Sequence, residues 1–69
     1  MEIKWLDDYS IEVKNDEGIT TISANKEGLL SLACQLKALA EAEPGSHIHY
    51  DEHNSLEEGS QELIIERTL

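Results

Sequence analysis

The chain has little cysteine, proline and aromatic residue content. Its 69 residues include one cysteine, one proline, one tryptophan, two tyrosines and no phenylalanine. The single cysteine, Cys34, excludes an internal disulfide and suits a reducing compartment. The four glycines are isolated from one another, which excludes a glycine-rich phosphate-binding loop.

Long apolar runs are also missing. The longest, Leu63-Ile64-Ile65, is far shorter than the ~20 residues of a membrane helix. Glu2 and Lys4 stand where the apolar part of a signal peptide would begin. We therefore expect a cytoplasmic protein with no membrane partner, folded as a single domain over residues 1–69.

Acidic residues dominate the charge. Fifteen Asp and Glu face five Lys and Arg, which gives a formal net charge of −10. Such a chain repels nucleic acid and attracts basic protein surfaces. Between Ala38 and Glu66 there is no Lys or Arg, and the acids there are Glu41, Glu43, Asp51, Glu52, Glu57, Glu58, Glu62 and Glu66. Ordinary solubility charge and a partner-binding surface both remain open as explanations.

Hydrophobic periodicity predicts an α+β fold in two layers. Alternating residues indicate strands at about 2–6, 9–14, 19–23, 47–51 and 61–67, and a 3.6-residue period indicates a helix at about 26–43. The expected architecture is one helix packed on a mainly antiparallel sheet of four to five strands, in the order β-β-β-α-β-β.

The helix has clear ends and a clear stripe. Asn25 is the expected N-cap, and Pro44 cannot continue the helix. Gly28 costs about 1 kcal/mol relative to alanine, which indicates a local packing reason. Ser31, Gln35 and Glu41 are expected to face water. The predicted buried stripe is Leu29, Leu32, Ala33, Leu36, Leu39 and Ala40.

The last two strands are expected to pair with Tyr50 near Gln61. Ile48, Tyr50, Leu63 and Ile65 then share the face that covers the helix. The opposite face carries His47, His49, Glu62, Ile64 and Glu66. Ile64 would form an apolar centre with an acidic rim, which is typical of a protein interface. An edge contact with a neighbouring strand or with a homodimer partner explains its position equally well.

The pattern His47-x-His49-x-Asp51 is the strongest candidate for a ligand set. At ~3.3 Å per residue its ends lie about 13 Å apart, too far to share one zinc ion. Only a neighbouring pair helped by Glu62 could bind a metal, and cross-strand pairing of the histidines with carboxylates is the simpler interpretation. We expect no metal and no cofactor, but a small metal-binding protein that uses this strand remains an alternative.

Catalysis has little support in the residues. Cys34 is mid-helix, with no histidine one turn away to activate a thiol. A general acid needs a desolvated carboxyl group in a pocket, for which a two-layer domain of this length has little room. We predict that the protein is not an enzyme.

The second half of the chain resembles the immunity protein 32 family of bacterial polymorphic toxin systems. The resemblance covers about residues 25–67, and its specific part is the Gly45-x-His47-x-His49-x-Asp51 run followed by Gly59-Ser60-x-Glu62-Leu63. The other matching positions are Gly28-Leu29, Leu32-Ala33, Leu36, Leu56 and Ile64-Ile65-Glu66.

The resemblance implies a small α+β protein that binds and neutralises a cognate toxin. Charge adds the hypothesis that the toxin has a basic surface, which an acidic inhibitor would mask. A homodimeric structural or adaptor protein is the remaining alternative. The predicted partner-binding residues are His47, His49, Asp51, Glu52, Glu57, Glu58, Glu62 and Ile64.

Overall fold

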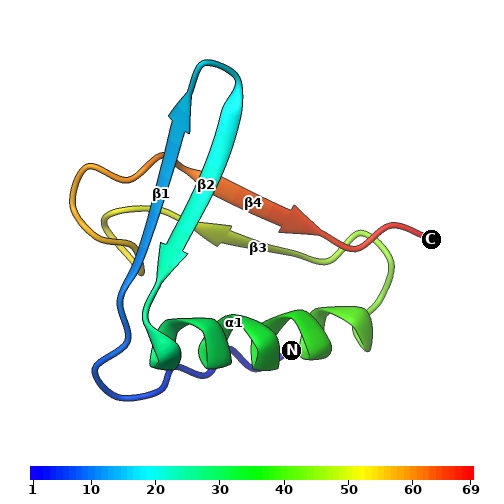
Figure 1. Ribbon diagram of the computed structural model, residues 1–69. Helices are drawn as coiled ribbons and strands as arrows, with labels where there is room; N and C mark the ends of the chain where they lie inside the picture. The colour runs from blue at the N-terminus through cyan, green and yellow to red at the C-terminus, as the bar shows by residue number, and fades with distance from the viewer.

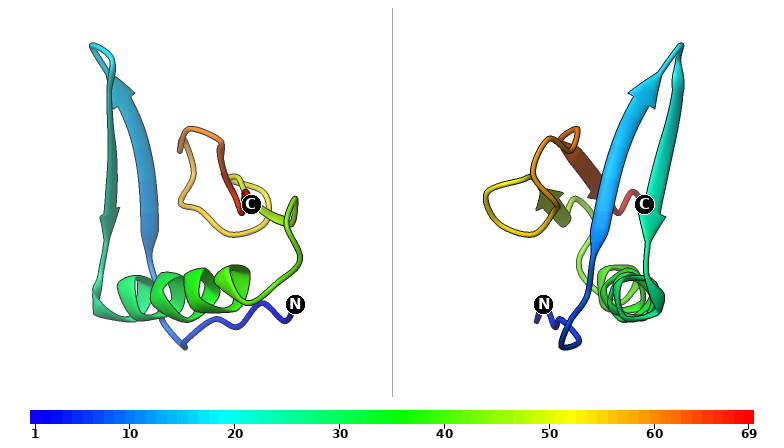
Figure 2. Two further views of the ribbon diagram at one scale, coloured as in Figure 1. Left: turned by 90° about the vertical axis from the view of Figure 1, so that its right-hand side faces the viewer. Right: turned by 60° about the vertical axis from the view of Figure 1, so that its left-hand side comes forward.

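The computed structural model describes residues 1–69 as one helix and two β-hairpins (Figure 1). The elements are β1 (Ile11–Asp16), β2 (Ile19–Ala24), α1 (Lys26–Ala40), β3 (His47–Tyr50) and β4 (Leu63–Glu66). Both hairpins stand on the same side of the helix and cross each other steeply (Figures 1 and 2). The helix is neither long nor apolar enough to cross a membrane.

The predicted single sheet of four to five strands is wrong. β1 pairs only with β2, and β3 pairs only with β4, so the fold contains two separate two-stranded antiparallel sheets. The free edge of β1 is used by the loop after β3 instead of by a strand. The amide of Glu57 donates to the carbonyl of Ile11 at 2.9 Å, and that of Gln61 donates to Val13 at 2.7 Å.

The expected first strand, residues 2–6, joins no sheet either. Its backbone is bonded to side chains of the helix. The amide of Leu6 donates to Oγ of Ser31 at 2.9 Å, and Nε2 of Gln35 donates to the carbonyl of Lys4 at 2.7 Å. Because these two side chains satisfy the backbone of the segment, it does not need a neighbouring strand.

The helix is therefore turned away from its predicted orientation. Ser31 and Gln35, expected to face water, are each 1 % exposed, and Leu39 is buried beside them. Leu29 and Leu36, expected in the core, are 56 % and 44 % exposed. The helix buries the face that carries Ser31 and Gln35 because these side chains hydrogen-bond the N-terminal segment. Hydropathy alone does not predict such a polar buried face.

The beginning of the helix is fixed as the sequence predicts. Asn25 is the N-cap, and its Oδ1 accepts from the amide of Gly28 at 2.8 Å and from that of Ser10 at 2.9 Å. A Cβ on Gly28 would lie 2.5 Å from the carbonyl oxygen of Ser10 and 2.9 Å from the Ile11 side chain. The packing reason expected for this glycine is thus the close approach of β1 to the first turn.

The turn between β1 and β2 has positive φ at both central residues, 51° at Glu17 and 81° at Gly18. This is the conformation of a two-residue turn whose twist matches that of the strands. It sets the register in which Asp16 pairs with Ile19 and Val13 pairs with Ile22.

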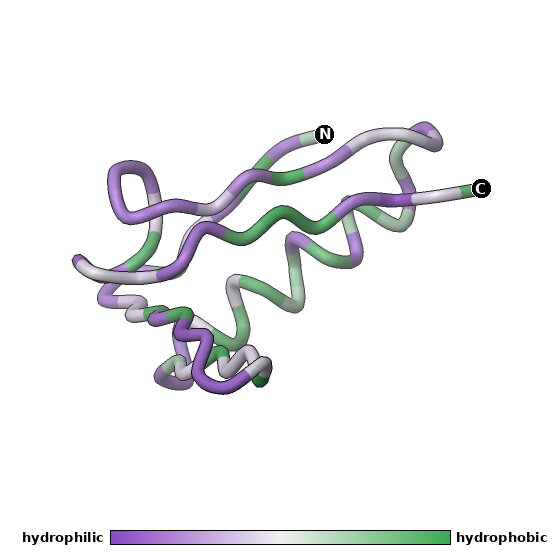
Figure 3. The backbone as a smooth tube through the Cα atoms, turned by 90° about the horizontal axis from the view of Figure 1, so that it is seen from above, coloured by the Kyte–Doolittle hydropathy of each residue, from purple (hydrophilic) through white to green (hydrophobic).

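The core lies where both hairpins meet the helix. Its buried members are Ile11, Val13, Leu39, Ile48, Tyr50 and Leu56. Trp5 packs against this cluster and stacks on Tyr9 with ring centroids 4.3 Å apart. Figure 3 shows hydrophobic colour along β4 and hydrophilic colour along the loop that precedes it.

Candidate partner-binding surface

The β3–β4 hairpin presents a polar face on the side away from the core. Its register pairs His49 with Ile64 and His47 with Glu66. Ile48 and Tyr50 are buried, which confirms the predicted alternation of faces. Ile64 is 55 % exposed and both histidines are exposed. We call His47, His49, Glu62 and Ile64 the strand patch.

One histidine of the strand patch lies among carboxylates. Nε2 of His49 is 3.3 Å from Oε1 of Glu62 and 3.8 Å from Oδ2 of Asp51. Glu62 directly precedes β4, which pairs with β3, and this places its carboxylate beside His49. These three residues each offer one donor atom, and the donor atoms lie within 4.8 Å of one another. His47 is not part of this group, so the two histidines of the sequence pattern do not act as a pair.

Two of the predicted contact residues have structural roles in the loop. Oδ1 of Asp51 accepts from the amides of His53 at 2.9 Å and Asn54 at 3.0 Å. Oε2 of Glu52 accepts from the amide of Gly59 at 2.7 Å, which closes the loop across its ends. Carboxylates that accept backbone hydrogen bonds hold the chain in a fixed turn.

Glu57 and Glu58 follow this turn and are exposed. The hydrogen bond from Glu57 to β1 brings them beside Glu12. The three acids share a shallow depression that is also lined by Ser10, Ser23, Ala24 and Asn25. We call Glu12, Glu57 and Glu58 the loop patch.

Sequence reasoning missed Glu12 as a member of this surface. The alternation of β1, in which Ile11 and Val13 are buried, places Glu12 on the outer face. That signal was present in the sequence. What the sequence could not supply was the attachment of the loop to β1, because it joins residues 46 positions apart through main-chain atoms.

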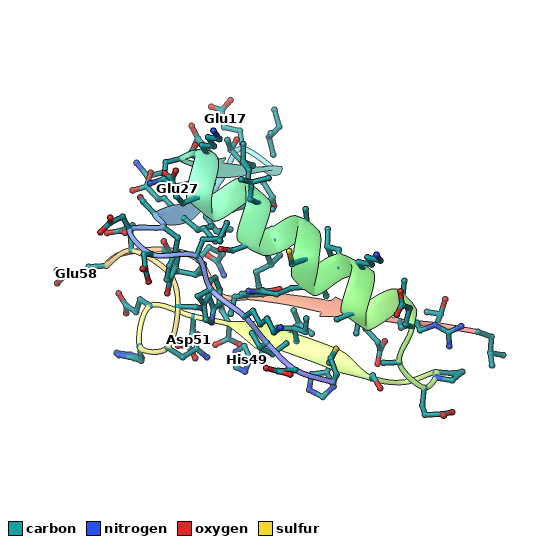
Figure 4. All side chains as sticks on the ribbon, turned by 90° about the horizontal axis from the view of Figure 1, so that it is seen from below. Glu17, Glu27, His49, Asp51 and Glu58 are labelled. Atoms are coloured by element: carbon teal, nitrogen blue, oxygen red, sulfur yellow. The ribbon has the colours of Figure 1, made fainter.

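The acidic residues are not all on one side of the molecule. In Figure 4, Glu58 lies at the rim of the loop, and Asp51 and His49 lie near one another beside β3. Glu17 and Glu27 lie higher in the same view, beside the β1–β2 hairpin and the start of the helix. The loop and the β3–β4 hairpin therefore carry one part of the negative charge, and the β1–β2 turn and the helix start carry another.

A pocket of about 320 Å³ opens beside β3, next to the histidines. Met1, Ile3 and Trp5 of the N-terminal segment form its apolar wall, and β3 forms the other. The sequence analysis did not predict this pocket, because it depends on the N-terminal segment lying along the helix and not in a sheet.

Comparison with known families identifies the chain. The family model described as immunity protein 32 matches residues 19–68, which is most of the sequence. The chain belongs to the immunity protein 32 family. Neither the search of curated proteins nor that of solved structures found a match.

The immunity protein 32 match begins at β2 and runs through β4. All eight residues predicted to bind a partner fall inside it, and Glu12 of the loop patch falls outside. The resemblance inferred from the Gly-x-His-x-His-x-Asp run is thus confirmed. Assignment to this family supports the role of an immunity protein.

Proposed function

We propose that this protein neutralises a cognate toxin in the bacterial cytoplasm by covering a basic surface of the toxin with its acidic loop and β3–β4 hairpin. The observation that carries the proposal is the attachment of the loop to β1, through the hydrogen bonds from Glu57 to Ile11 and from Gln61 to Val13. This attachment holds Glu57 and Glu58 outward beside Glu12, whose carboxylate also lies 3.5 Å from Nζ of the exposed Lys14.

Charge supports a basic partner. The protein has a net charge of −10, and its loop and β3–β4 hairpin contain no lysine or arginine. Complementary charge accelerates the encounter of two proteins and fixes their orientation. A toxin that acts on nucleic acid has a basic active site, so carboxylates of the loop patch can occupy the positions of the phosphates.

The strand patch supplies the apolar contact. Ile64 is flanked by Glu62 and Glu66 along β4, and it pairs with His49 across the hairpin. An exposed isoleucine surrounded by polar groups matches the anatomy of an interface, in which a desolvated centre is rimmed by charge. In this arrangement Asp51 and Glu52 act indirectly, because their carboxylates shape the loop.

Inhibition of this kind requires no chemistry by the immunity protein. The carboxylates bind and block, and the apolar centre lengthens the lifetime of the complex. The proposal agrees with the prediction, made from the residues, that the protein is not an enzyme.

Co-expression with the toxin encoded beside it tests the proposal. The wild-type protein should restore growth, and Ile64→Glu and the double variant Glu57→Gln/Glu58→Gln should restore it less well. The double variant Glu2→Gln/Glu41→Gln removes the same charge from exposed positions outside both patches and should protect as the wild type does. Toxicity that the wild-type protein does not reduce would end the proposal.

A second candidate function is metal binding, which the donor group of His49, Asp51 and Glu62 favours. The bonds of Oδ1 of Asp51 to the loop leave Oδ2 directed to His49, and such orientation of a ligand by a second contact strengthens metal sites. Zinc titration followed by histidine NMR shifts tests it. His49→Ala should abolish binding and His47→Ala should not; equal effects of the two variants would count against this donor group.

A further inference from the structure

The outer edge of β2 has no neighbour within the chain. β2 pairs only with β1, and in the left-hand view of Figure 2 no other element lies on its far side. Its residues from Ile19 to Ser23 are all exposed. The outer edge of β1 differs, because the loop before β4 bonds it. The hairpin thus has one occupied edge and one open edge.

The register shows which main-chain groups of β2 are open. Val13 turns its carbonyl away from β2, to the amide of Gln61 at 2.7 Å. In an antiparallel pair such a residue stands opposite one that also turns its main-chain groups outward, and the partner of Val13 is Ile22. The N–H and C=O groups of Ile22, and by alternation those of Thr20, therefore point out of the hairpin. No loop or helix group bonds them.

β2 also lacks the features that keep a free edge from pairing. Edge strands are commonly protected by charged residues, proline or a bulge. β2 reads Ile-Thr-Thr-Ile-Ser-Ala, with no charge and no proline, and it pairs with β1 without a bulge. Ile19 and Ile22 are 67 % and 42 % exposed. Such an edge is a template for a further strand.

The end of β2 lies beside the loop patch. Ser23 and Ala24 line the same depression as the three carboxylates of that patch. Lys14, which lies 3.5 Å from Glu12, offsets one of these three charges and leaves two. A strand on the open edge would therefore meet negative charge at this end of β2.

We infer that the open edge of β2 receives an extended segment of the toxin, which carries a lysine or arginine opposite Ser23. The inference rests on the proposed function and specifies one contact through which it acts. Ser23 pairs with Glu12, so the basic residue, Ser23 and Glu12 form one row across the sheet. Because strands lie ~4.8 Å apart, a long basic side chain can pass over the small Ser23 and reach the Glu12 carboxylate.

A second copy of the chain fits this edge less well. Two-fold, antiparallel pairing of two β2 strands places the start of each strand beside the end of the other. Asp16 and Glu17 of one copy, which directly precede β2, then approach the loop patch of the other. These like charges repel, and each chain has a net charge of −10. A basic segment is attracted to the same place.

Hydrogen exchange followed by NMR tests the inference on the full chain, free and bound to the toxin encoded beside it. The amides of Thr20 and Ile22 should exchange readily in the free protein and at least about tenfold more slowly in the complex. Toxin binding without this protection would overturn the inference and leave the proposed function standing, whereas no binding would overturn both. Protection that grows with the concentration of the protein alone would assign the edge to a second copy and also overturn the inference.

Thr20→Pro removes the outward N–H and places a ring at the open edge, a position where strands tolerate proline. It should weaken toxin binding at least about tenfold, whereas Thr20→Ala keeps the amide and should weaken binding no more than about twofold. Equal affinities of these two variants would contradict strand addition. Circular dichroism verifies that both are folded.

Ser23→Lys tests the basic side chain of the incoming segment. It places a second cation in the row beside Glu12 and should weaken toxin binding about three- to tenfold at low salt. The matched control is Ser23→Gln, which adds a long side chain without charge. Equal affinities of the lysine and glutamine variants would overturn the basic residue opposite Ser23.

Discussion

The hydroxyl of Tyr50 in β3 donates a 2.7 Å hydrogen bond to Oε1 of Gln35 in α1, and each residue is 1 % exposed. Nε2 of the same glutamine donates to the carbonyl of Lys4. One buried amide therefore joins three parts of the chain that are distant in sequence. Buried polar groups satisfied in this way specify a unique arrangement, because any other packing would leave them unpaired.

Replacing Tyr50 with phenylalanine should destabilise the protein by about 1–3 kcal/mol, because Oε1 of Gln35 would stay buried without a donor. Urea unfolding followed by circular dichroism measures the loss. Tyr9→Phe is the matched control, since Tyr9 is only partly buried, and it should cost about 0.5 kcal/mol or less. Equal losses in the two variants would mean that the hydrogen bond to Gln35 adds nothing.

The ionisation of Tyr50 should also lower the free energy of unfolding at alkaline pH. Burial raises the pKa of Tyr50 above its ordinary value of 10.0. Above that value the unfolded chain releases the phenolic proton while the folded chain keeps it, so rising pH favours unfolding. The contribution is complete below pH 10.0 and is lost as pH rises through the pKa of the folded state.

Comparing urea midpoints of the wild type and Tyr50→Phe between about pH 8 and about pH 11 isolates this effect from other titrating groups. The difference in stability between them should shrink as pH rises. A difference that stays constant over that range would show that Tyr50 ionises alike in both states.

Gly28→Ala should destabilise the protein, although alanine is the better helix former by about 1 kcal/mol. The new Cβ would meet the carbonyl oxygen of Ser10, a backbone atom held by the hydrogen bond from Asn25. Overpacking of this kind costs about 1–3 kcal/mol net. Thermal unfolding gives the sign directly, and a raised melting temperature would show that β1 can move away from the helix.

Removal of two loop carboxylates should act mainly on the rate of toxin association. Glu57→Gln/Glu58→Gln should lower the association rate constant about three- to tenfold at low salt, with a smaller effect at high salt, where exposed charges are screened. Stopped-flow mixing with the toxin measures the association rate constant at low and at high salt. An effect confined to the dissociation rate would place these residues in the desolvated centre of the interface, contrary to the proposal.

The sequence predicted the local features well. Asn25 as the N-cap, a packing reason for Gly28 and the alternation of Ile48 and Tyr50 were each stated from residue type and spacing, and each is confirmed. The N-cap and the strand alternation depend on residues close in sequence or on a two-residue period, whereas the contact that explains Gly28 is with the distant Ser10. Short-range rules are sufficient for the first two features, and for Gly28 they indicate only that a packing reason exists.

The tertiary arrangement was not predictable in the same way. The helix offered two faces, one with leucines and one with Ser31 and Gln35, and hydropathy favours burying the leucines. The structure buries the polar face because the N-terminal segment and Tyr50 supply its hydrogen-bond partners. For the candidate site, the acids of the loop were visible in the sequence, but their grouping with Glu12 depends on main-chain bonds between distant segments.

Residues 57–61 are fastened to β1 mainly through backbone atoms, with the hydroxyl of Ser60 adding a bond to Val13 at 3.2 Å. The conformation of this segment is therefore nearly independent of which side chains stand at positions 57 and 58. Under the proposed mechanism, substitutions at those two positions would change which toxin is recognised while the scaffold stays the same. Sequence changes at these outward positions should therefore alter the free energy of unfolding little. We expect sequence differences between family members to concentrate there.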